Sequence, residues 1–300
     1  MIHAVIPPGA NEAAIAGGIQ GFPVEICPAK TIDAYAIAQA EWVLEGYVDT
    51  SERAWETEEA EKVGRPGVAP FFPEWTGYFG RAYRAFKFQV TAITHRKDKP
   101  IFYTPLAHSF EGLALSQYLR EACFCELADR IAPGFVVDVH IPLPMKVFSG
   151  VVFQVRKRRV RDEGMQADIL GAALAVSPGL RMAVAVDDDV DIYSEGDVIW
   201  ALASRFNPAT GIIKGSSRRG MIAMPAEQAG AGTAKGVADF AFEGGIGFDA
   251  TVPYNLRHLF TKAKYPVDKI DLKKWLSEAD ISRAQAMQSE YAKLLAKTGQ

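Results

Sequence analysis

The pattern of hydrophobic and polar positions changes near residue 106. Before it, β-branched and aromatic residues gather in short runs between Gly, Pro and charged clusters, which predicts strands. These runs are residues 23–27, 40–48, 86–94 and 101–104. The Ala- and Gly-rich residues 11–21 are expected to form one short helix before the first strand. Residues 49–73 begin with acidic residues and end among prolines, and we expect a long loop there.

Helical and strand-like patterns alternate in the next part of the chain. Helices are expected at residues 111–130, 166–176 and 194–206, and strands at 135–141, 147–155 and 182–186. This alternation is typical of an α/β layer with a mostly parallel sheet. Residues 214–248, rich in Gly, Ala and Ser, are expected to be a loop. A final apolar stripe runs through Ala284, Met287, Tyr291, Leu294 and Leu295, and predicts a helix that packs on the body or on a second subunit.

Composition and charge exclude several classes of protein. The 300 residues are 49% hydrophobic and 23% charged, which is typical of a globular chain and not of a collagen-like, disordered or disulfide-dense one. A net charge of −3 provides no general attraction for nucleic acid or anionic lipid, so neither is expected as a partner. The sparse cysteines, Cys27, Cys123 and Cys125, indicate reduced thiols. Without a signal peptide or an apolar run of about 18 residues, a cytoplasmic protein with no membrane span is expected.

Several charged segments have a functional and an ordinary interpretation. The acidic residues 187–191 follow a buried strand and could bind a hard cation, or could be a turn of solvated and capping acids. The basic residues 156–161 could bind a polyanion, but a solvated strand end is the favoured interpretation. Residues 229–236 lack the spacing of a phosphate-binding loop. The five histidines show no metal-ligand spacing.

Two glutamates are candidates for chemistry. Glu41 lies in an otherwise apolar strand, where Glu41, Val43 and Glu45 share one face. A carboxylate on a half-buried face must be paired, be protonated or hold a cation. Glu74 lies among aromatic residues after a proline-rich turn, where a raised pKa would suit a proton donor. A surface glutamate at the end of a loop is the alternative for Glu74.

Five segments follow one another in an order that is shared with one family: residues 41–47 (EWVLEGY), 73–78 (PEWTGY), 90–96 (VTAITHR), 186–190 (VDDDV) with 197–202 (DVIWAL), and 247–251 (GFDAT). Together they resemble the UbiD-type decarboxylases, which use prenylated flavin mononucleotide. The resemblance extends from about Ala4 to Thr251. It implies an α+β or α/β fold: half of a flavin-binding split β-barrel, an α/β domain and a C-terminal helical tail. We place these parts at residues 1–107, 108–255 and 256–300, the tail serving oligomerisation.

The resemblance also implies roles for particular residues. Glu41 matches a ligand of the divalent cation, manganese or magnesium, that bridges to the flavin phosphate. The resemblance also allows a potassium ion as a further cofactor. Glu74 matches the general acid near the reactive centre of the flavin. Arg181 matches a lysine that contacts the flavin phosphate, and arginine can serve that role. The substrate pocket is implied at four residues: Leu106, His108, Ser109 and Phe110.

Two departures from the family pattern affect the expected function. Ala69 stands where the family has its first catalytic glutamate. The portion of the family that carries the catalytic arginine, the other metal ligands and most of the flavin cradle has no match in this sequence. Half a barrel exposes unpaired strand edges, and one carboxylate is too few ligands for a dication. We therefore expect a second UbiD-like chain to complete the barrel and the site.

Two functions follow from the resemblance. The first is a subunit of a two-component decarboxylase, possibly reversible, that acts on an α,β-unsaturated or aromatic carboxylic acid. In it, prenylated flavin is the electron sink, Glu74 donates the proton, and the chain is inactive without its partner. The second is a non-catalytic subunit that stabilises a catalytic relative. Ala69 favours the second function, whereas Glu41, Glu74 and Arg181 favour the first.

Overall fold

The computed structural model of the chain describes residues 11–64, 70–102, 110–177, 179–215, 245–263 and 269–297. The chain divides into two units, Met1–Tyr254 and Asn255–Gln300. Every strand that the structure describes belongs to the first unit. The first unit combines sheets with helices, which confirms the expected mixture of α and β structure.

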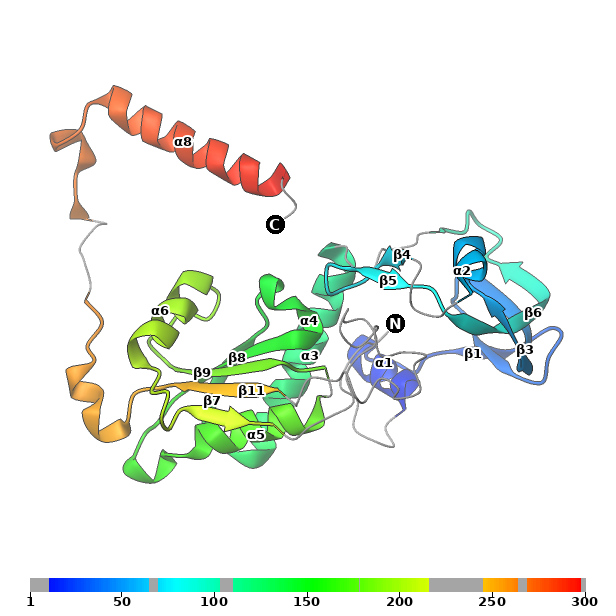
Figure 1. The fold of residues 1–300 in the computed structure, drawn as a ribbon, viewed down its shortest axis with the longest axis horizontal. Coiled ribbons are helices and arrows are strands. Elements are labelled where there is room, and N and C mark those ends of the chain that lie inside the picture. Colours follow the sequence, from blue (N-terminus) through cyan, green and yellow to red (C-terminus); the bar gives the residue numbers. More distant parts are fainter. Residues whose placement is uncertain are drawn as a thin grey trace. The chain divides into compact units, whose positions relative to one another are not determined.

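A five-stranded sheet is the centre of the first unit (Figure 1), and its strand order is β10-β11-β9-β8-β7. Its strands are β7 (Val136–His140), β8 (Gly150–Val155), β9 (Met182–Asp187), β10 (Ile212–Lys214) and β11 (Ile246–Ala250). Strands β8, β9 and β11 are parallel, and the two edge strands run antiparallel to their neighbours. The expected parallel arrangement is found for the three central strands, whereas both edge pairings are antiparallel, so the sheet is mixed.

Helices cover both faces of this sheet. On one face, α3 (Phe110–Ile131) and α5 (Met165–Val176) bury Phe124 and Leu170 against alternate sheet residues such as Phe153. On the other face, α6 (Glu195–Arg205) packs through Val198 and Ala201. Because both faces are covered, the central strands are apolar on both sides, which is typical of parallel sheets.

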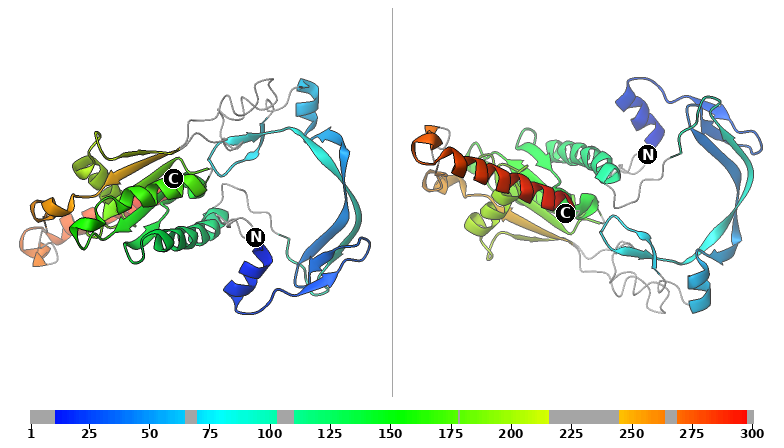
Figure 2. Two further views of the ribbon diagram at one scale, coloured as in Figure 1. Left: turned by 90° about the horizontal axis from the view of Figure 1, so that it is seen from below. Right: turned by 90° about the horizontal axis from the view of Figure 1, so that it is seen from above.

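A long two-stranded ribbon precedes the central sheet. It pairs β3 (Trp42–Trp55) antiparallel to β6 (Arg84–His95), and Figure 2 shows it as a curved ribbon. Two small hairpins accompany it. They are β1 (Ile26–Pro28) with β2 (Tyr35–Ile37), and β4 (Pro70–Pro73) with β5 (Phe79–Arg81). Among the described residues, no third strand pairs with β3 or β6.

The expected loop at residues 49–73 is wrong in large part. Strand β3 continues to Trp55, because β6 supplies paired backbone groups as far as Arg84. Then α2 (Glu58–Val63) begins, where the Thr57 hydroxyl accepts the Ala60 N–H at 3.1 Å. Glu58, Glu59 and Glu61 occupy the first turn of this helix, where the helix dipole favours negative charge. Residues 65–69 lie outside the described residues, as do 103 and 104 of the strand expected at 101–104.

Two further expectations need correction. Residues 147–149 are not the start of a strand but part of α4 (Lys146–Ser149), and β8 begins at Gly150. Residues 246–248, the end of the expected loop, are instead the start of β11, which lies beside β9 inside the sheet. The glycines of this segment weaken its strand pattern, and pairing with β9 and β10 stabilises the strand. Residues 216–244 lie outside the described residues.

The remaining helices follow local signals. In α1 (Glu12–Gln20), the Asn11 side chain caps the start and Gly21, with a φ of 83°, ends the helix. In the second unit, α8 (Glu278–Lys297) is the expected terminal helix, and Met287 on its apolar stripe is exposed. No described helix has the length and apolarity that crossing a membrane would require.

Candidate active site

Arg181 lies at the amino end of β9, between two neighbouring strands of the sheet. Its backbone N–H donates to the Ser149 carbonyl at 2.8 Å, and its carbonyl accepts the Ile246 N–H at 2.9 Å. The Ser149 hydroxyl is buried and has no hydrogen-bond partner in the described part of the chain. A guanidinium and an unused hydroxyl at adjacent strand ends are donors suited to an anionic group such as a phosphate.

Glu74 lies in the tight turn between β4 and β5 and is half-buried. Its N–H donates to the Tyr78 carbonyl at 2.8 Å, and its carbonyl accepts the Gly77 N–H at 2.9 Å. Gly80 leaves room for the carboxyl group, since a Cβ there would stand 3.1 Å from Glu74 Oε1. The next residue, Trp75, is buried against the α/β part of the first unit. The turn therefore presents the carboxyl group from a fixed backbone.

Glu41 is engaged in contacts within the chain. One oxygen accepts from Arg96 Nη1 at 2.9 Å, and the other accepts the Ile101 N–H at 3.0 Å. The Ile101 N–H, followed by the Arg96 side chain, lowers the pKa of Glu41. These contacts tie the start of β3 to the segment after β6. Within the described ranges there is no group of three His, Cys, Asp or Glu side chains that could hold a metal ion. Glu41 and its surroundings thus do not fit a dication site by themselves.

Glu45 is a buried carboxylate whose role the sequence analysis did not identify. It accepts the backbone N–H groups of Lys30 and Thr31 at 2.7 to 2.9 Å, and the Thr31 hydroxyl at 2.9 Å. The Lys30 N–H is the largest cause of the lowered pKa of Glu45. The alternation that placed Glu45 on a half-buried face was the signal for such pairing. Its function is to anchor the 30–31 loop on β3.

The acidic run after β9 is held by ion pairs within the chain. Arg205 donates to Asp187 Oδ2 at 3.0 Å and, through two nitrogens, to both oxygens of Asp189 at 2.7 Å. The Asp189 contact is the largest cause of the raised pKa of Arg205. Arg156 pairs with Asp188 at 2.7 Å. Three acids of the run therefore have cationic side chains of the same chain as partners.

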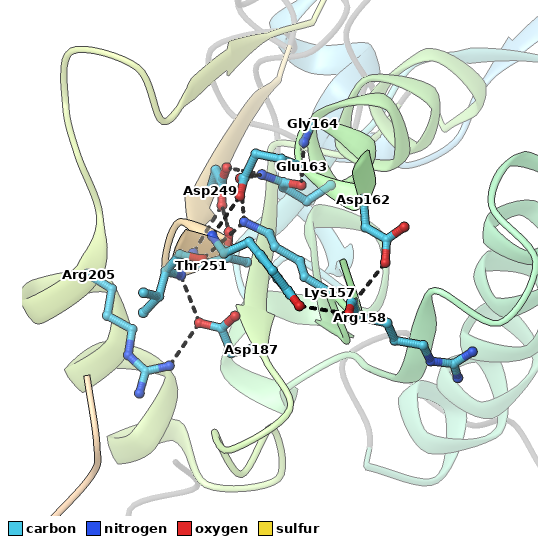
Figure 3. A network of polar contacts seen from close by, with 12 residues as sticks. Lys157, Arg158, Asp162, Glu163, Gly164, Asp187, Arg205, Asp249 and Thr251 are labelled. Atoms are coloured by element: carbon cyan, nitrogen blue, oxygen red, sulfur yellow. Dashed lines mark hydrogen bonds and ion pairs between the residues drawn. The ribbon is translucent and has the colours of Figure 1, made fainter. Parts of the chain in front are cut away.

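A polar network closes the carboxyl ends of the parallel strands (Figure 3). The ammonium of Lys157, which is 1% exposed, donates to Glu163 at 2.6 Å and to the Val252 carbonyl at 3.2 Å. Gln166 joins Glu163 to Asp249, with distances of 3.1 and 2.8 Å. Open α/β sheets commonly bind ligands at this end. Here the charged groups satisfy one another, whereas the unused donor of Ser149 lies at the opposite, amino end.

The basic run at residues 156–161 is largely neutralised inside its own domain. Besides the pairs of Arg156 and Lys157, Arg159 pairs with Asp162 at 3.1 Å. The Asp162 carboxylate also accepts the backbone N–H of Arg158 at 2.8 Å. The interpretation as a solvated strand end therefore fits the exposed arginines of the run, whereas Lys157 is buried in an ion pair.

The proposed substrate-pocket residues are mostly not placed. Leu106, His108 and Ser109 lie outside the described residues. Phe110 begins α3, and its side chain is also outside them. The same holds for Ala69 and for the glycine-rich residues 229–236. The structure does bring Ser149 next to Arg181, and it joins the turn of Glu74 to α3 and α4 through Trp75.

The β3–β6 ribbon exposes many large apolar side chains. Those at least 37% exposed are Trp42, Leu44, Tyr47, Val48, Phe86, Phe88, Val90 and Ile93. Large apolar side chains exposed in such number on one ribbon are typical of a surface that another element covers. Among the described residues the outer edges of both strands are unpaired, and they offer backbone donors and acceptors to that element.

Comparison with known proteins identifies the family. Residues 1–108 match the Rift-related domain of the UbiD family, 3-octaprenyl-4-hydroxybenzoate carboxy-lyase, and residues 114–250 match its C-terminal domain. The gallate decarboxylase of Lactiplantibacillus plantarum is 30% identical over 260 residues, which are 86% of this chain and 51% of that protein.

Solved structures agree with this assignment. An evolved dimeric form of the UbiD-class enzyme HmfF from Pelotomaculum thermopropionicum, in complex with prFMN, has a TM-score of 0.66 and 26% identity over 91% of this chain and 53% of that one. The 3,4-dihydroxybenzoic acid decarboxylase AroY of Klebsiella pneumoniae has a TM-score of 0.70 and 28% identity over 87% and 52%. The chain thus spans about half the length of the relatives it matches. With both domain models matched in order along most of its length, the chain belongs to the UbiD carboxy-lyase family.

Proposed function

We propose that the chain is a subunit of a decarboxylase that acts on an α,β-unsaturated or aromatic carboxylic acid, with a prenylated flavin as cofactor and Glu74 as proton donor. The observation that carries this proposal is the Glu74 turn, which two backbone hydrogen bonds close and which Trp75 fixes to the α/β part of the unit. A general acid needs such a defined position. Family membership and the flavin-bound relative support the reaction class.

The flavin, when bound, would supply the electron sink for loss of carbon dioxide. Arg181 and the Ser149 hydroxyl are the groups of this chain suited to hold its phosphate, because one brings positive charge and the other a buried, unused hydroxyl. Glu74 would deliver the proton to the carbon that has lost its carboxylate. The described residues do not fit a manganese, magnesium or potassium site, so we derive no step through such an ion.

A partner chain follows from the exposed ribbon. The apolar side chains and open edges of β3 and β6 can be covered if further strands extend the ribbon into a barrel. We propose that a second UbiD-like chain supplies these strands, and that activity depends on it. The second unit, with its exposed Met287 on α8, is proposed to join subunits of the same kind.

The test is coexpression of the chain with a UbiD-like partner and a flavin prenyltransferase. Carbon dioxide release would be measured with gallic acid and 3,4-dihydroxybenzoic acid, the substrates that the relatives' names suggest as probes. Glu74→Gln should lower kcat at least 100-fold, in the range that general acids contribute, while the complex retains its flavin. Glu59→Gln, an exposed residue of α2, is the matched control. Undiminished turnover in Glu74→Gln would remove Glu74 from the role of acid.

The second candidate function is a non-catalytic subunit that stabilises a catalytic relative. Ala69, which stands where the family has its first catalytic glutamate, favours it. Flavin retention by the assembled complex separates the two candidates. Arg181→Met should release flavin from a catalytic subunit, whereas a scaffold would lose none. Glu41→Ala gives a second comparison: loss of flavin there would restore the cofactor role implied for Glu41.

A further inference from the structure

Arg120 is a buried cation without a carboxylate partner in the described part of the chain. It lies on the buried face of α3 that also carries Leu113, Gln117 and Phe124, and it is 4% exposed. Its Nη2 donates to the Ser177 hydroxyl at 2.8 Å, while its buried Nε has no acceptor. Burial lowers the pKa of Arg120 to about 10. Burying a charge without an opposite charge beside it costs free energy. The contacts of the Arg120 side chain must therefore offset part of this cost.

The guanidinium is stacked on aromatic rings. Its central carbon lies 4.7 Å from the centre of the Phe148 ring and 5.6 Å from that of Phe124. Such cation–π contacts partly replace the lost hydration of the charge. They also restrict the ring, because a rigid planar cation covers one of its faces. Phe148 belongs to α4, so Arg120 connects α3 to α4.

Phe148 in turn contacts the residue beside the proposed acid. The rings of Trp75 and Phe148 meet edge to face, with centres 4.9 Å apart and planes at 68°. Trp75 is 7% exposed and packs in one cluster with Leu113 and Val147. Glu74 and Trp75 are adjacent in a tight turn. A movement of the indole would therefore move the backbone that carries the Glu74 carboxyl group.

We propose that Arg120 is a positioning residue for Glu74, acting through Phe148 and Trp75. The guanidinium holds the Phe148 ring, the ring supports the Trp75 indole, and the indole fixes the turn between β4 and β5. The consequence for catalysis rests on the proposed role of Glu74 as proton donor. The effect of Arg120 on the rigidity of the turn is independent of that role, and it can be measured on this chain alone.

The first test is hydrogen exchange of the backbone amides of residues 70–81 in the full chain. Arg120→Met removes the charge and the planar face but keeps a long apolar side chain, a replacement that buried ions often tolerate without loss of stability. It should accelerate exchange of the Glu74 and Gly77 amides at least tenfold. Phe148→Leu, which leaves Arg120 in place, should do the same. Phe124→Leu is the matched control, because Phe124 contacts Arg120 but lies in a different core cluster from Trp75.

Unchanged exchange at residues 70–81 in both Arg120→Met and Phe148→Leu would overturn the proposal, as would equal acceleration by Phe124→Leu.

The second test is activity of the assembled complex. Arg120→Met should lower kcat about tenfold with KM changed less than twofold. Arg120→Lys should not restore kcat, because an ammonium lacks the planar face. The two proposals fail separately. A fully active Glu74→Gln variant rejects the proton donor and leaves the exchange result standing, whereas unchanged exchange rejects the positioning and leaves the donor standing.

Discussion

Glu45 and Thr31 are joined by two hydrogen bonds, from the Thr31 N–H at 2.7 Å and from its hydroxyl at 2.9 Å, to one carboxylate oxygen. A bulge beside this contact adds Thr91 of β6 to it. Between Glu45 and Gly46 the pairing with β6 shifts, which leaves Thr91 without a partner residue on β3. The Thr91 hydroxyl then lies 2.6 Å from that of Thr31. Bulges commonly redirect a side chain in this way.

Removal of this carboxylate should release the loop. In Glu45→Leu, the Lys30 and Thr31 amides lose their acceptor, so their hydrogen exchange should rise at least tenfold. The conservative Glu45→Gln keeps one acceptor oxygen and should show a smaller rise. Exchange measured by mass spectrometry on residues 26–37 checks this. Equal protection in the wild type and Glu45→Leu would mean that the loop is held by other contacts.

Gly46 should tolerate no side chain. A Cβ there would stand 2.0 Å from the Gln89 carbonyl oxygen, so Gly46→Ala must push β3 away from β6. We expect a loss of about 2 kcal/mol, within the usual range for single substitutions, measured by urea denaturation or exchange of the ribbon amides. Gly18→Ala is the control, because α1 leaves open space at that position. It should stabilise the helix by up to about 1 kcal/mol. Destabilisation of equal size in both variants would contradict the steric argument.

The pair between Arg205 and Asp187 should be important for stability, because both side chains are buried, at 2% and 3% exposure. Arg205→Met would leave the Asp187 carboxylate without its cation and should cost about 3–5 kcal/mol. Arg130→Met is the control: the pair of Arg130 with Glu126 is exposed and should contribute at most about 1 kcal/mol. Chemical denaturation of both variants measures the difference. Similar losses of stability in the two variants would show that burial does not determine how much an ion pair contributes to stability.

Asp162 should contribute to the loss of stability in acid. Backbone and side-chain hydrogen bonds, that of the Arg158 N–H foremost, lower its pKa from the model-peptide value of 3.8. Because the folded pKa lies below the unfolded one, the stabilisation is complete above the unfolded pKa and is lost as the pH falls through the folded pKa. Asp162→Asn should therefore be less stable than the wild type at pH 7, and the difference should shrink below pH 4. If the stability difference between the wild type and Asp162→Asn grew in acid, the folded pKa of Asp162 would not lie below the unfolded one.

Local signals in the sequence were sufficient for α1, α3, α5, α6 and α8, and for strands β7 and β9. Asn11 and Ser194 accept hydrogen bonds from the first-turn amides of α1 and α6, within three residues of themselves. The run at residues 182–186 is apolar throughout, and only a strand covered on both faces accommodates it. The family resemblance rested on the same kind of local information, since its motifs are short and contiguous. Its match to UbiD is confirmed.

Contacts between distant segments decided the rest. Strand β11 has a weak local pattern, and β9 alongside it makes it a strand. Strand β3 continues beyond residue 48 because β6, some thirty residues later, pairs with it. The partners of Glu41 and Arg120 lie 55 and 57 residues away along the chain. The period of hydrophobic residues reports which face of an element is buried, but a carboxylate or guanidinium finds its partner only when the folded chain brings that partner within about 3 Å.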